Sequence, residues 1–370
     1  MSAPMHTLPG DDYRSEEIYK LECETIFTNE WMYAGREETL AAPGDRLVVD
    51  VGNESVLIVR DKFGQLQAFY NVCRHRGSQL CESSGSGFGG AITCPYHAWS
   101  YSLDGKLVAT PRVGADEIDR NQLSLWPVAV DSWQNFIFVC LAAKPTPLMQ
   151  WLKETPESPL DFDHLDLASL RIGAVTTSEV AANWKILVEN YSECLHCPTV
   201  HPELVEIIPT YRTGSVVDET RSDGGVAMLA GVTAYAPAGS PALPIIGGMT
   251  ELDKESYYGA AVFPNVWFDI NASVITTTRL IARSAQHTTI VMEYLLPPET
   301  LDDPKYDITH VIDFTELVTR QDNDICARAQ KGINSRAFTQ GIFAPKDFIA
   351  HAFTRYYLER RGPAQSDRSQ

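Results

Sequence analysis

The stretch "NVCRHRGSQLCESSGSGFGGAITCPYHAW" (residues 71–99) holds three cysteines and two histidines, and it decides how the first part of the chain folds. Cys73 is separated from His75 by one residue, and Cys94 is separated from His97 by two. Strand-like segments flank both pairs, so we expect two loops that each present one thiolate and one imidazole at the tip. Together the two loops offer four ligands to one metal centre.

Two kinds of metal centre use two cysteines and two histidines. Zinc takes such sets, but its ligands usually pair Cys with Cys and His with His along the chain. A Rieske [2Fe-2S] cluster binds both cysteines to one iron and both histidines to the other, so each loop supplies one ligand to each iron. We therefore favour a cluster held by Cys73, His75, Cys94 and His97, with a structural zinc site as the alternative.

The composition excludes several classes of function. A net charge of -18 argues against a nucleic-acid partner, because phosphate binding needs clustered Lys and Arg. The sequence has no apolar run of the length that a membrane helix needs, and no basic and apolar signal at its start. Eight cysteines spread over 370 residues do not resemble a secreted disulfide scaffold. We expect a cytoplasmic protein without a membrane partner.

The order of predicted elements indicates an α+β protein. Residues 14–35 carry apolar side chains at helical spacing, and residues 46–143 read as strands with tight turns at Gly52-Asn53 and Asp104-Gly105. Four prolines in residues 142–162 mark a boundary. The predicted parts are an N-terminal helical segment (1–40), an all-β domain (41–145) and a second domain (146–370) against which the helical segment packs.

The second domain is predicted to mix strands and helices. A loop at residues 236–249 is either a lid over a pocket or an ordinary exposed excursion. The predicted elements are a strand at 171–180, a helix at 184–194, an antiparallel pair at 273–283 and 288–297, and helices at 309–332 and 346–360.

A second candidate metal site lies in "NWKILVENYSECLHCPTVHPEL" (residues 183–204). Glu193 and His196 share one face of a helix. Pro198 should break that helix and bring His201 back toward His196. Two histidines and a carboxylate from elsewhere form the facial triad of non-haem Fe(II) oxygenases. The alternatives are two ordinary histidines, and a Cys194-x-x-Cys197 pair that is redox-active, zinc-binding or simply one turn apart on a helix.

The two motifs together resemble the α subunit of the Rieske non-haem iron (ring-hydroxylating) oxygenases. The string "NWK…ENY.EC.HC…HP" and the segment "VTRQDNDICARAQKGINSR" (318–336) are most similar to the branch of carnitine monooxygenase and glycine betaine monooxygenase. The resemblance implies a helix-grip (START-like) catalytic domain with an antiparallel sheet. It also implies that His196, His201 and Asp322 bind the iron, with Asp324 as the rival carboxylate. Gln321 and Leu195 depart from the pattern, in which Glu and Tyr are frequent.

The resemblance also implies how the two sites cooperate. In the family, a ring of three chains brings the cluster of one chain beside the mononuclear iron of its neighbour. Glu193 takes the place of the bridging acid between an iron-bound histidine and His97 of the adjacent chain, and Asn190 that of an asparagine lining the iron site. O2 is the co-substrate, and a separate reductase delivers electrons from NAD(P)H, because no nucleotide-binding motif is present in this sequence.

The substrate stays open at this point. The branch suggests a small quaternary ammonium compound that is hydroxylated beside nitrogen and then loses an aldehyde. The alternatives are hydroxylation or demethylation of an aromatic (carboxylate) substrate, and a Rieske electron-transfer protein without catalysis. Aromatic faces bind quaternary ammonium groups. The candidates for such a cage, each of which could equally be core, are Tyr257, Tyr258, Phe263, Trp267 and Phe268.

Overall fold

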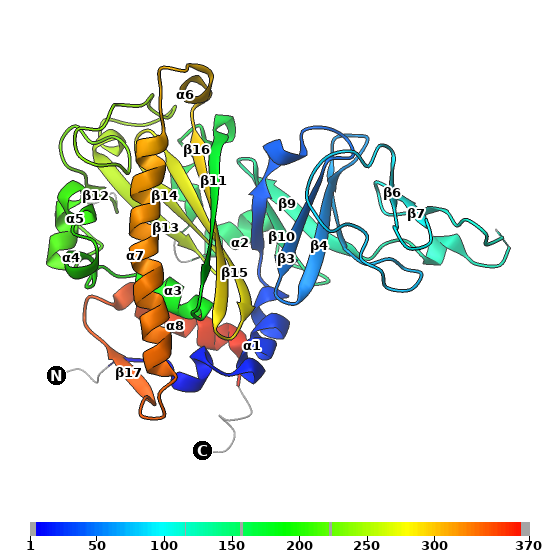
Figure 1. Cartoon of the computed structure of the whole chain (residues 1–370), viewed down its shortest axis with the longest axis horizontal. Coiled ribbons are helices and arrows are strands. Elements are labelled where there is room, and N and C mark those ends of the chain that lie inside the picture. The colour runs from blue at the N-terminus through cyan, green and yellow to red at the C-terminus, as the bar shows by residue number, and fades with distance from the viewer. Residues whose placement is uncertain (1–4, 115, 156–157, 222–223, 364–370) are drawn as a thin grey trace. The chain divides into compact units, whose positions relative to one another are not determined.

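The computed structural model describes residues 5–114, 116–155, 158–221 and 224–363. The chain forms two compact units (Figure 1). One unit is Ile26–Trp151, and the other joins the residues up to Thr25 with those from Leu152 onward. The boundaries predicted from sequence fall after residues 40 and 145 instead.

The unit Ile26–Trp151 is built from antiparallel strands. The predicted hairpin at Gly52-Asn53 is confirmed, because Val51 pairs with Glu54 across it. The turn at Gly105 also forms, and a side chain there would collide with the Phe69 ring, which lies 2.5 Å from the position of an added Cβ. The larger sheet has the order β2-β10-β9-β5-β4-β3 and the smaller one β6-β7-β8. The strands are β2 (Met32–Arg36), β3 (Arg46–Val51), β4 (Glu54–Arg60), β5 (Leu66–Tyr70), β6 (Ala91–Thr93), β7 (Ser100–Ser102), β8 (Leu107–Ala109), β9 (Pro127–Trp133) and β10 (Phe136–Cys140).

The helix predicted over residues 14–35 is wrong in its second half. The α-helix α1 covers only Glu16–Glu22, and a helical turn continues through Phe27. The chain then enters strand β2, whose five residues are all buried and pair with β10. Pairing and burial in the sheet therefore override the helical spacing of the apolar residues here.

The other unit is organised around a second antiparallel sheet, of order β11-β16-β15-β14-β13-β12. The predicted antiparallel pair is confirmed as the two ten-residue strands β15 and β16. Near the chain ends, β1 (Met5–Pro9) pairs with β17 (Gln340–Phe343). The strands of the sheet are β11 (Arg171–Val180), β12 (Val226–Ala227), β13 (Ser256–Val262), β14 (Val266–Ile270), β15 (Ile275–Ser284) and β16 (His287–Leu296).

The helices of this unit cover the sheet. The longest, α7, runs across one face of the sheet in Figure 1, and its buried residues Val311, Phe314 and Val318 recur at helical spacing. The predicted helices at 184–194, 309–332 and 346–360 correspond to α3, α7 and α8. The helices are α2 (Leu148–Glu154), where the chain passes between the units, α3 (Trp184–Tyr191), α4 (Cys197–Val200), α5 (Leu204–Ile207), α6 (Pro298–Asp302), α7 (Thr309–Ile333) and α8 (Phe348–Arg361).

The segment 236–249 forms neither helix nor strand, as predicted. It is anchored to the unit, because Leu243 and Ile246 are buried and the Ile246 N–H donates to the Ala272 carbonyl at 2.9 Å. A search of the described residues for helices able to cross a bilayer finds none.

Candidate active site

The two loops that carry the cysteine and histidine pairs have the same backbone pattern. In each loop the cysteine N–H donates to the carbonyl five residues later, and the N–H four residues later donates to the cysteine carbonyl. Gly77 and Ala98 occupy the same place in the two loops, with φ of 73° and 59°. The bonds are Cys73 to Ser78 (2.8 Å), Gly77 to Cys73 (3.0 Å), Cys94 to Trp99 (2.8 Å) and Ala98 to Cys94 (3.1 Å).

The side chains of these loops separate by type. Cys73 and Cys94 are buried, whereas His75 is exposed and His97 is half-buried. The His75 and His97 rings lie 4.6 Å apart, and His75 stacks on Trp99 at 4.5 Å. Two buried thiols and two more accessible imidazoles in one place fit the donor set of a Rieske cluster.

Tyr101 is a residue of this site that the sequence reasoning missed. Its hydroxyl lies 3.3 Å from the Cys73 sulfur and accepts a hydrogen bond from the Arg74 N–H at 3.1 Å. Burial raises the pKa of the Cys73 thiol, and the contact with Tyr101 opposes that rise. Hydrogen bonds to cluster sulfurs tune reduction potential. The only signal in the sequence is the position of Tyr101 two residues after Trp99 on a short strand.

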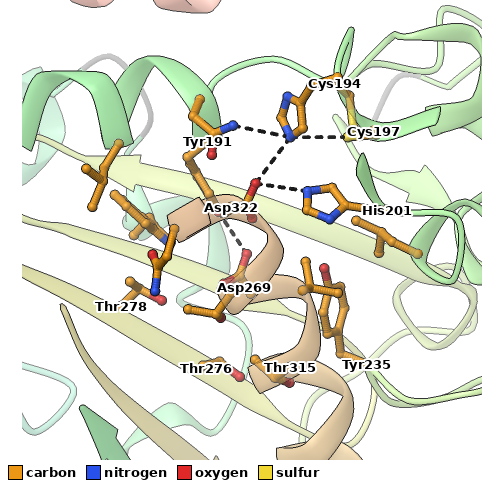
Figure 2. A pocket seen from close by; sticks show the side chains of 18 of the residues that line it. Tyr191, Cys194, Cys197, His201, Tyr235, Asp269, Thr276, Thr278, Thr315 and Asp322 are labelled. Atoms are coloured by element: carbon orange, nitrogen blue, oxygen red, sulfur yellow. Dashed lines mark hydrogen bonds and ion pairs between the residues drawn. A yellow bond between two sulfur atoms is a disulfide. The ribbon is translucent and has the colours of Figure 1, made fainter. Parts of the chain in front are cut away.

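The structure brings His196, His201 and Asp322 together, as the second candidate metal site predicts. One donor atom from each lies within 4.8 Å of the others. Asp322 Oδ1 is 2.9 Å from His201 Nε2 and 3.3 Å from His196 Nε2. Figure 2 shows the side chains of Asp322 and His201 pointing toward one another. The rival Asp324 is exposed on α7 and is not in this group.

The second nitrogen of each histidine ring is also held. His196 Nδ1 donates to Glu193 Oε1 at 2.6 Å, and His201 Nδ1 donates to Gln321 Oε1 at 2.8 Å. Both rings therefore direct Nε2 toward Asp322, as metal-binding histidines do when an outer acceptor fixes them. This donor set fits one Fe(II). Gln321 was noted in the sequence only as a departure from the family pattern, and its role as the acceptor for His201 was missed.

These contacts shift the pKa values of His196 and Asp322. Burial alone would lower the pKa of His196, but the hydrogen bonds that its ring donates to Asp322 and Glu193 raise it to about 9. Burial would raise the pKa of Asp322, but its hydrogen bonds to His196 and His201 hold that pKa below the usual value. Asn190 Nδ2 lies 3.3 Å from His196 Nε2, which places it at the metal side of the ring.

The chain bends between the two histidines, as Pro198 predicted. Helix α3 ends at Tyr191, and α4 begins at Cys197 with Pro198 in its first turn. Cys194 and Cys197 form a disulfide that closes the bend around His196. The expectation that these cysteines merely lie one turn apart on one helix is wrong, because α3 ends before either of them.

A cavity adjoins His196, His201 and Asp322, and aromatic residues line much of it. Of the predicted cage, Tyr257 and Trp267 line it. Side chains alternate along a strand, so Tyr258 and Phe268 face the other side of the sheet, and Phe263 packs on Phe353 with ring centres 4.9 Å apart. The cage prediction is wrong for these three. The aromatic residues that line the cavity are Tyr191, Tyr211, Tyr235, Tyr257 and Trp267.

Asp269 is a carboxylate in this wall that the sequence reasoning did not single out. It lies two residues after Trp267 on β14, so both side chains reach the cavity. Figure 2 shows Asp269 in the wall. The hydroxyls of Tyr191 (2.9 Å) and Tyr257 both donate to Asp269 Oδ1. Burial raises the pKa of Asp269 to about 6, although these two hydrogen bonds lower it.

Comparison with known protein families assigns both parts of the chain. The profile of the Rieske [2Fe-2S] domain matches residues 30–132, and that of the ring-hydroxylating α subunit (catalytic domain) matches residues 167–362. The first match selects the [2Fe-2S] cluster over the zinc alternative for the site in the β-unit.

Individual proteins that are similar to this chain are consistent with this family assignment. The glycine betaine monooxygenase oxygenase subunit of Pseudomonas aeruginosa is 28% identical over 387 aligned positions, which cover 96% of this chain and 89% of the relative. The carnitine monooxygenase oxygenase subunit of Acinetobacter pittii is 34% identical over 203 positions, 55% of this chain and 54% of the relative.

Solved structures share the fold. The quaternary ammonium Rieske monooxygenase CntA in complex with γ-butyrobetaine has a TM-score of 0.73 at 25% identity, over 95% of this chain and 96% of that one. Naphthalene 1,2-dioxygenase from Rhodococcus sp., with a TM-score of 0.74 at 20% identity over 96% and 93% of the two chains, has the same fold.

Proposed function

The chain belongs to the ring-hydroxylating oxygenases as a Rieske-type α subunit, and on that premise we propose that it hydroxylates a small quaternary ammonium compound beside its nitrogen. The observation that carries the proposal is an aromatic cavity that opens directly onto His196, His201 and Asp322. Aromatic faces attract such cations. The relatives named for glycine betaine and carnitine support the same substrate class.

Each metal site has a defined set of ligands in this proposal. Cys73, His75, Cys94 and His97 would hold the [2Fe-2S] cluster. His196, His201 and Asp322 would hold the mononuclear iron. When bound, the cluster supplies electrons and the iron activates O2 for insertion into the substrate.

The chain's own residues orient the reaction. Glu193 accepts a hydrogen bond from His196 Nδ1 and so fixes the ring with Nε2 toward the iron position. Asn190 places an amide beside that nitrogen, where it can orient a small molecule at the iron. Trp267 and Tyr257 would bind the ammonium group and exclude water from the reacting carbon.

The proposal includes a reductase and an assembly. Electrons come from NAD(P)H through a separate reductase. The chain forms a homotrimer in the cytoplasm, in which Glu193 also accepts a hydrogen bond from His97 of the adjacent protomer. A similar solved protein is described as showing inter-subunit electron transfer, which supports this arrangement.

Iron content tests the two sites separately. The purified protein should contain about three iron atoms per chain, two in the cluster and one mononuclear. His201→Ala should lose only the mononuclear iron, because that ring is buried beside Asp322, while the visible spectrum of the cluster persists. The half-exposed His287, which pairs with Glu179, provides the matched control His287→Ala with unchanged iron. Two iron atoms per chain in the unmodified protein would contradict the mononuclear site.

Substrate class is tested by NADH-driven O2 uptake with a surrogate reductase. We expect uptake coupled to aldehyde release from quaternary amines, and none from aromatic acids. A ring-hydroxylated product with no turnover of any quaternary amine would exclude the proposed reaction.

A further inference from the structure

Asp269 carries a negative charge into the cavity without a cationic partner. Both tyrosine hydroxyls donate to the same oxygen of Asp269, Oδ1. The nearby charge of Asp322 raises the pKa of Asp269 further and so opposes its ionisation. Burial therefore disfavours the ionised form of Asp269, and a positive group beside it would stabilise that form.

The cavity wall does not supply that positive group. Among the described residues that line the cavity there is no Lys and no Arg. The carboxylates and imidazoles of the wall come from Glu193, Asp269 and Asp322 and from the two histidines that face Asp322. No Lys or Arg of the described lining pairs with Asp269, so a molecule that enters the cavity can supply the cation.

The surroundings of Asp269 suit an alkylated ammonium group. Tyr191 stacks on Trp267 with ring centres 4.4 Å apart, and Tyr257 lies beside Tyr235 at 5.9 Å. These rings and the carboxylate face one space, so a cation there gains attraction from ring faces and from a full negative charge. A fully alkylated nitrogen has no N–H to donate, so the tyrosine hydroxyls remain the hydrogen-bond donors to Asp269.

We propose that Asp269 is the counter-ion of the substrate's ammonium nitrogen, and that the substrate is a cation without a carboxylate, such as a hydroxyalkyl-trimethylammonium, rather than a zwitterionic betaine. This inference rests on the proposed function and narrows it.

The same wall disfavours a substrate carboxylate. A second carboxylate in this small cavity would lie near Asp269 and would be repelled by it. The charge of a bound Fe(II) is already offset by Asp322 and by Glu193 on His196. The remaining polar wall is neutral, and hydroxyls such as those of Thr276 and Thr278 suit a substrate hydroxyl.

Anaerobic calorimetric titration of the metal-loaded protein, without reductase, tests this. Three probes are compared: choline, glycine betaine, and the neutral alcohol in which tert-butyl replaces the trimethylammonium group. We expect choline to bind roughly thirtyfold or more tightly than either other probe, because loss of one partner of an enclosed charge pair weakens binding by at least this factor. Asp269→Asn should remove the preference of choline over the neutral alcohol.

Glu189→Gln is the matched control. Glu189 is also a buried carboxylate that accepts a tyrosine hydrogen bond, from Tyr13 at 2.6 Å, and burial raises its pKa to about 7. It is absent from the described lining of the cavity, so this variant should bind choline like the wild type. If Asp269→Asn does not fold, the three probes on the wild type still decide, since equal affinity for choline and the neutral alcohol overturns the proposal.

The outcomes separate this inference from the proposed function. Binding of choline through Asp269 without any aldehyde product would support the counter-ion and contradict the proposed reaction. Turnover of quaternary amines that is unchanged in Asp269→Asn would uphold the reaction and overturn the counter-ion. If glycine betaine bound to the wild type as tightly as choline does, the proposed preference for a cation without a carboxylate would also be overturned.

Discussion

The two histidines that face Asp322 are held by different acceptors. His196 donates to the carboxylate of Glu193, whereas His201 donates to the amide oxygen of Gln321, which in turn donates to Glu203 at 3.1 Å. A carboxylate acceptor makes an imidazole a stronger ligand than a neutral amide does. Glu193 therefore has two roles in our proposal, since it orients His196 and links it to the neighbouring protomer.

Replacing Glu193 by Gln should separate those roles. An amide oxygen can still accept from His196 Nδ1, so we expect both metals to stay bound. Turnover should fall by roughly 10- to 100-fold, the usual effect of removing an outer-shell carboxylate. Stopped-flow absorbance should show slow re-oxidation of the reduced cluster when O2 and substrate are added.

The exposed Glu206, on α5, provides the control Glu206→Gln, which should react like the wild type. Cluster re-oxidation at the wild-type rate in Glu193→Gln would remove Glu193 from the electron path.

Local spacing predicted some site residues and not others. The pairs at Cys73 and Cys94, and His196 with His201, lie within short segments, where ligand spacing leaves a recognisable pattern. Asp322 lies 121 residues from His201, and only the family resemblance indicated it. Asp269 could not be found in this way, because a polar residue in an otherwise apolar strand looks like an ordinary solvent-facing position until the sheet is seen.

At the scale of elements, helix α3 connects the core of its unit to the site. At its start, Lys185 pairs with Glu22 of α1, and neither side chain is exposed to solvent. Glu22 also accepts hydrogen bonds from Trp184 (2.9 Å) and Tyr357 (2.8 Å). At its end, α3 presents Asn190 and Tyr191 to the cavity, so the buried pair fixes the helix that carries them.

Lys185→Met should destabilise this unit by about 3–5 kcal/mol, because it leaves the charge of Glu22 buried without its partner. The measurement is the thermal midpoint of preparations with equal metal content. The double variant Lys185→Met/Glu22→Gln should recover much of the loss, since the amide oxygen still accepts from Trp184 and no charge remains.

Lys254 and Glu251 form an ion pair in which Glu251 is largely exposed, so Lys254→Met serves as the control and should have little effect. A Lys185→Met protein as stable as that control would show that the buried pair does not anchor α3.

Helices and strands were predicted correctly from the sequence where one hydrophobic periodicity dominated a long segment. Helix α7 and strands β15 and β16 were predicted from long runs of one periodicity. Residues 32–36 were predicted as helix because the apolar spacing upstream was extended too far, and only the partner strand β10 decides their conformation. Long-range pairing of this kind leaves no local trace.

At the scale of the whole molecule, the two metal sites belong to different compact units of the chain. The proposed cluster ligands Cys73, His75, Cys94 and His97 lie in the unit Ile26–Trp151, and His196, His201 and Asp322 lie in the other. Each unit has its own sheet and its own core. A ligand of one site can therefore be replaced without unfolding the unit that contains the other site. This independence allows the path of the electrons to be tested by mixing chains.

Co-expression of Cys73→Ser chains, which lack the cluster, with His201→Ala chains, which lack the mononuclear iron, tests transfer between protomers. Each variant alone should be inactive. In a ring of three, every mixed assembly has one junction at which an intact cluster meets the intact iron of its neighbour, so about a third of the wild-type activity should return.

Tandem affinity tags on the two chains isolate the mixed assemblies for this measurement. Separately purified variants combined without subunit exchange should stay inactive, because neither ring then contains a complete junction. A mixed assembly that holds both kinds of metal centre yet remains inactive would mean that electrons pass only within a chain. In that case Glu193 would serve His196 alone, and its link to His97 of a neighbour would have to be abandoned.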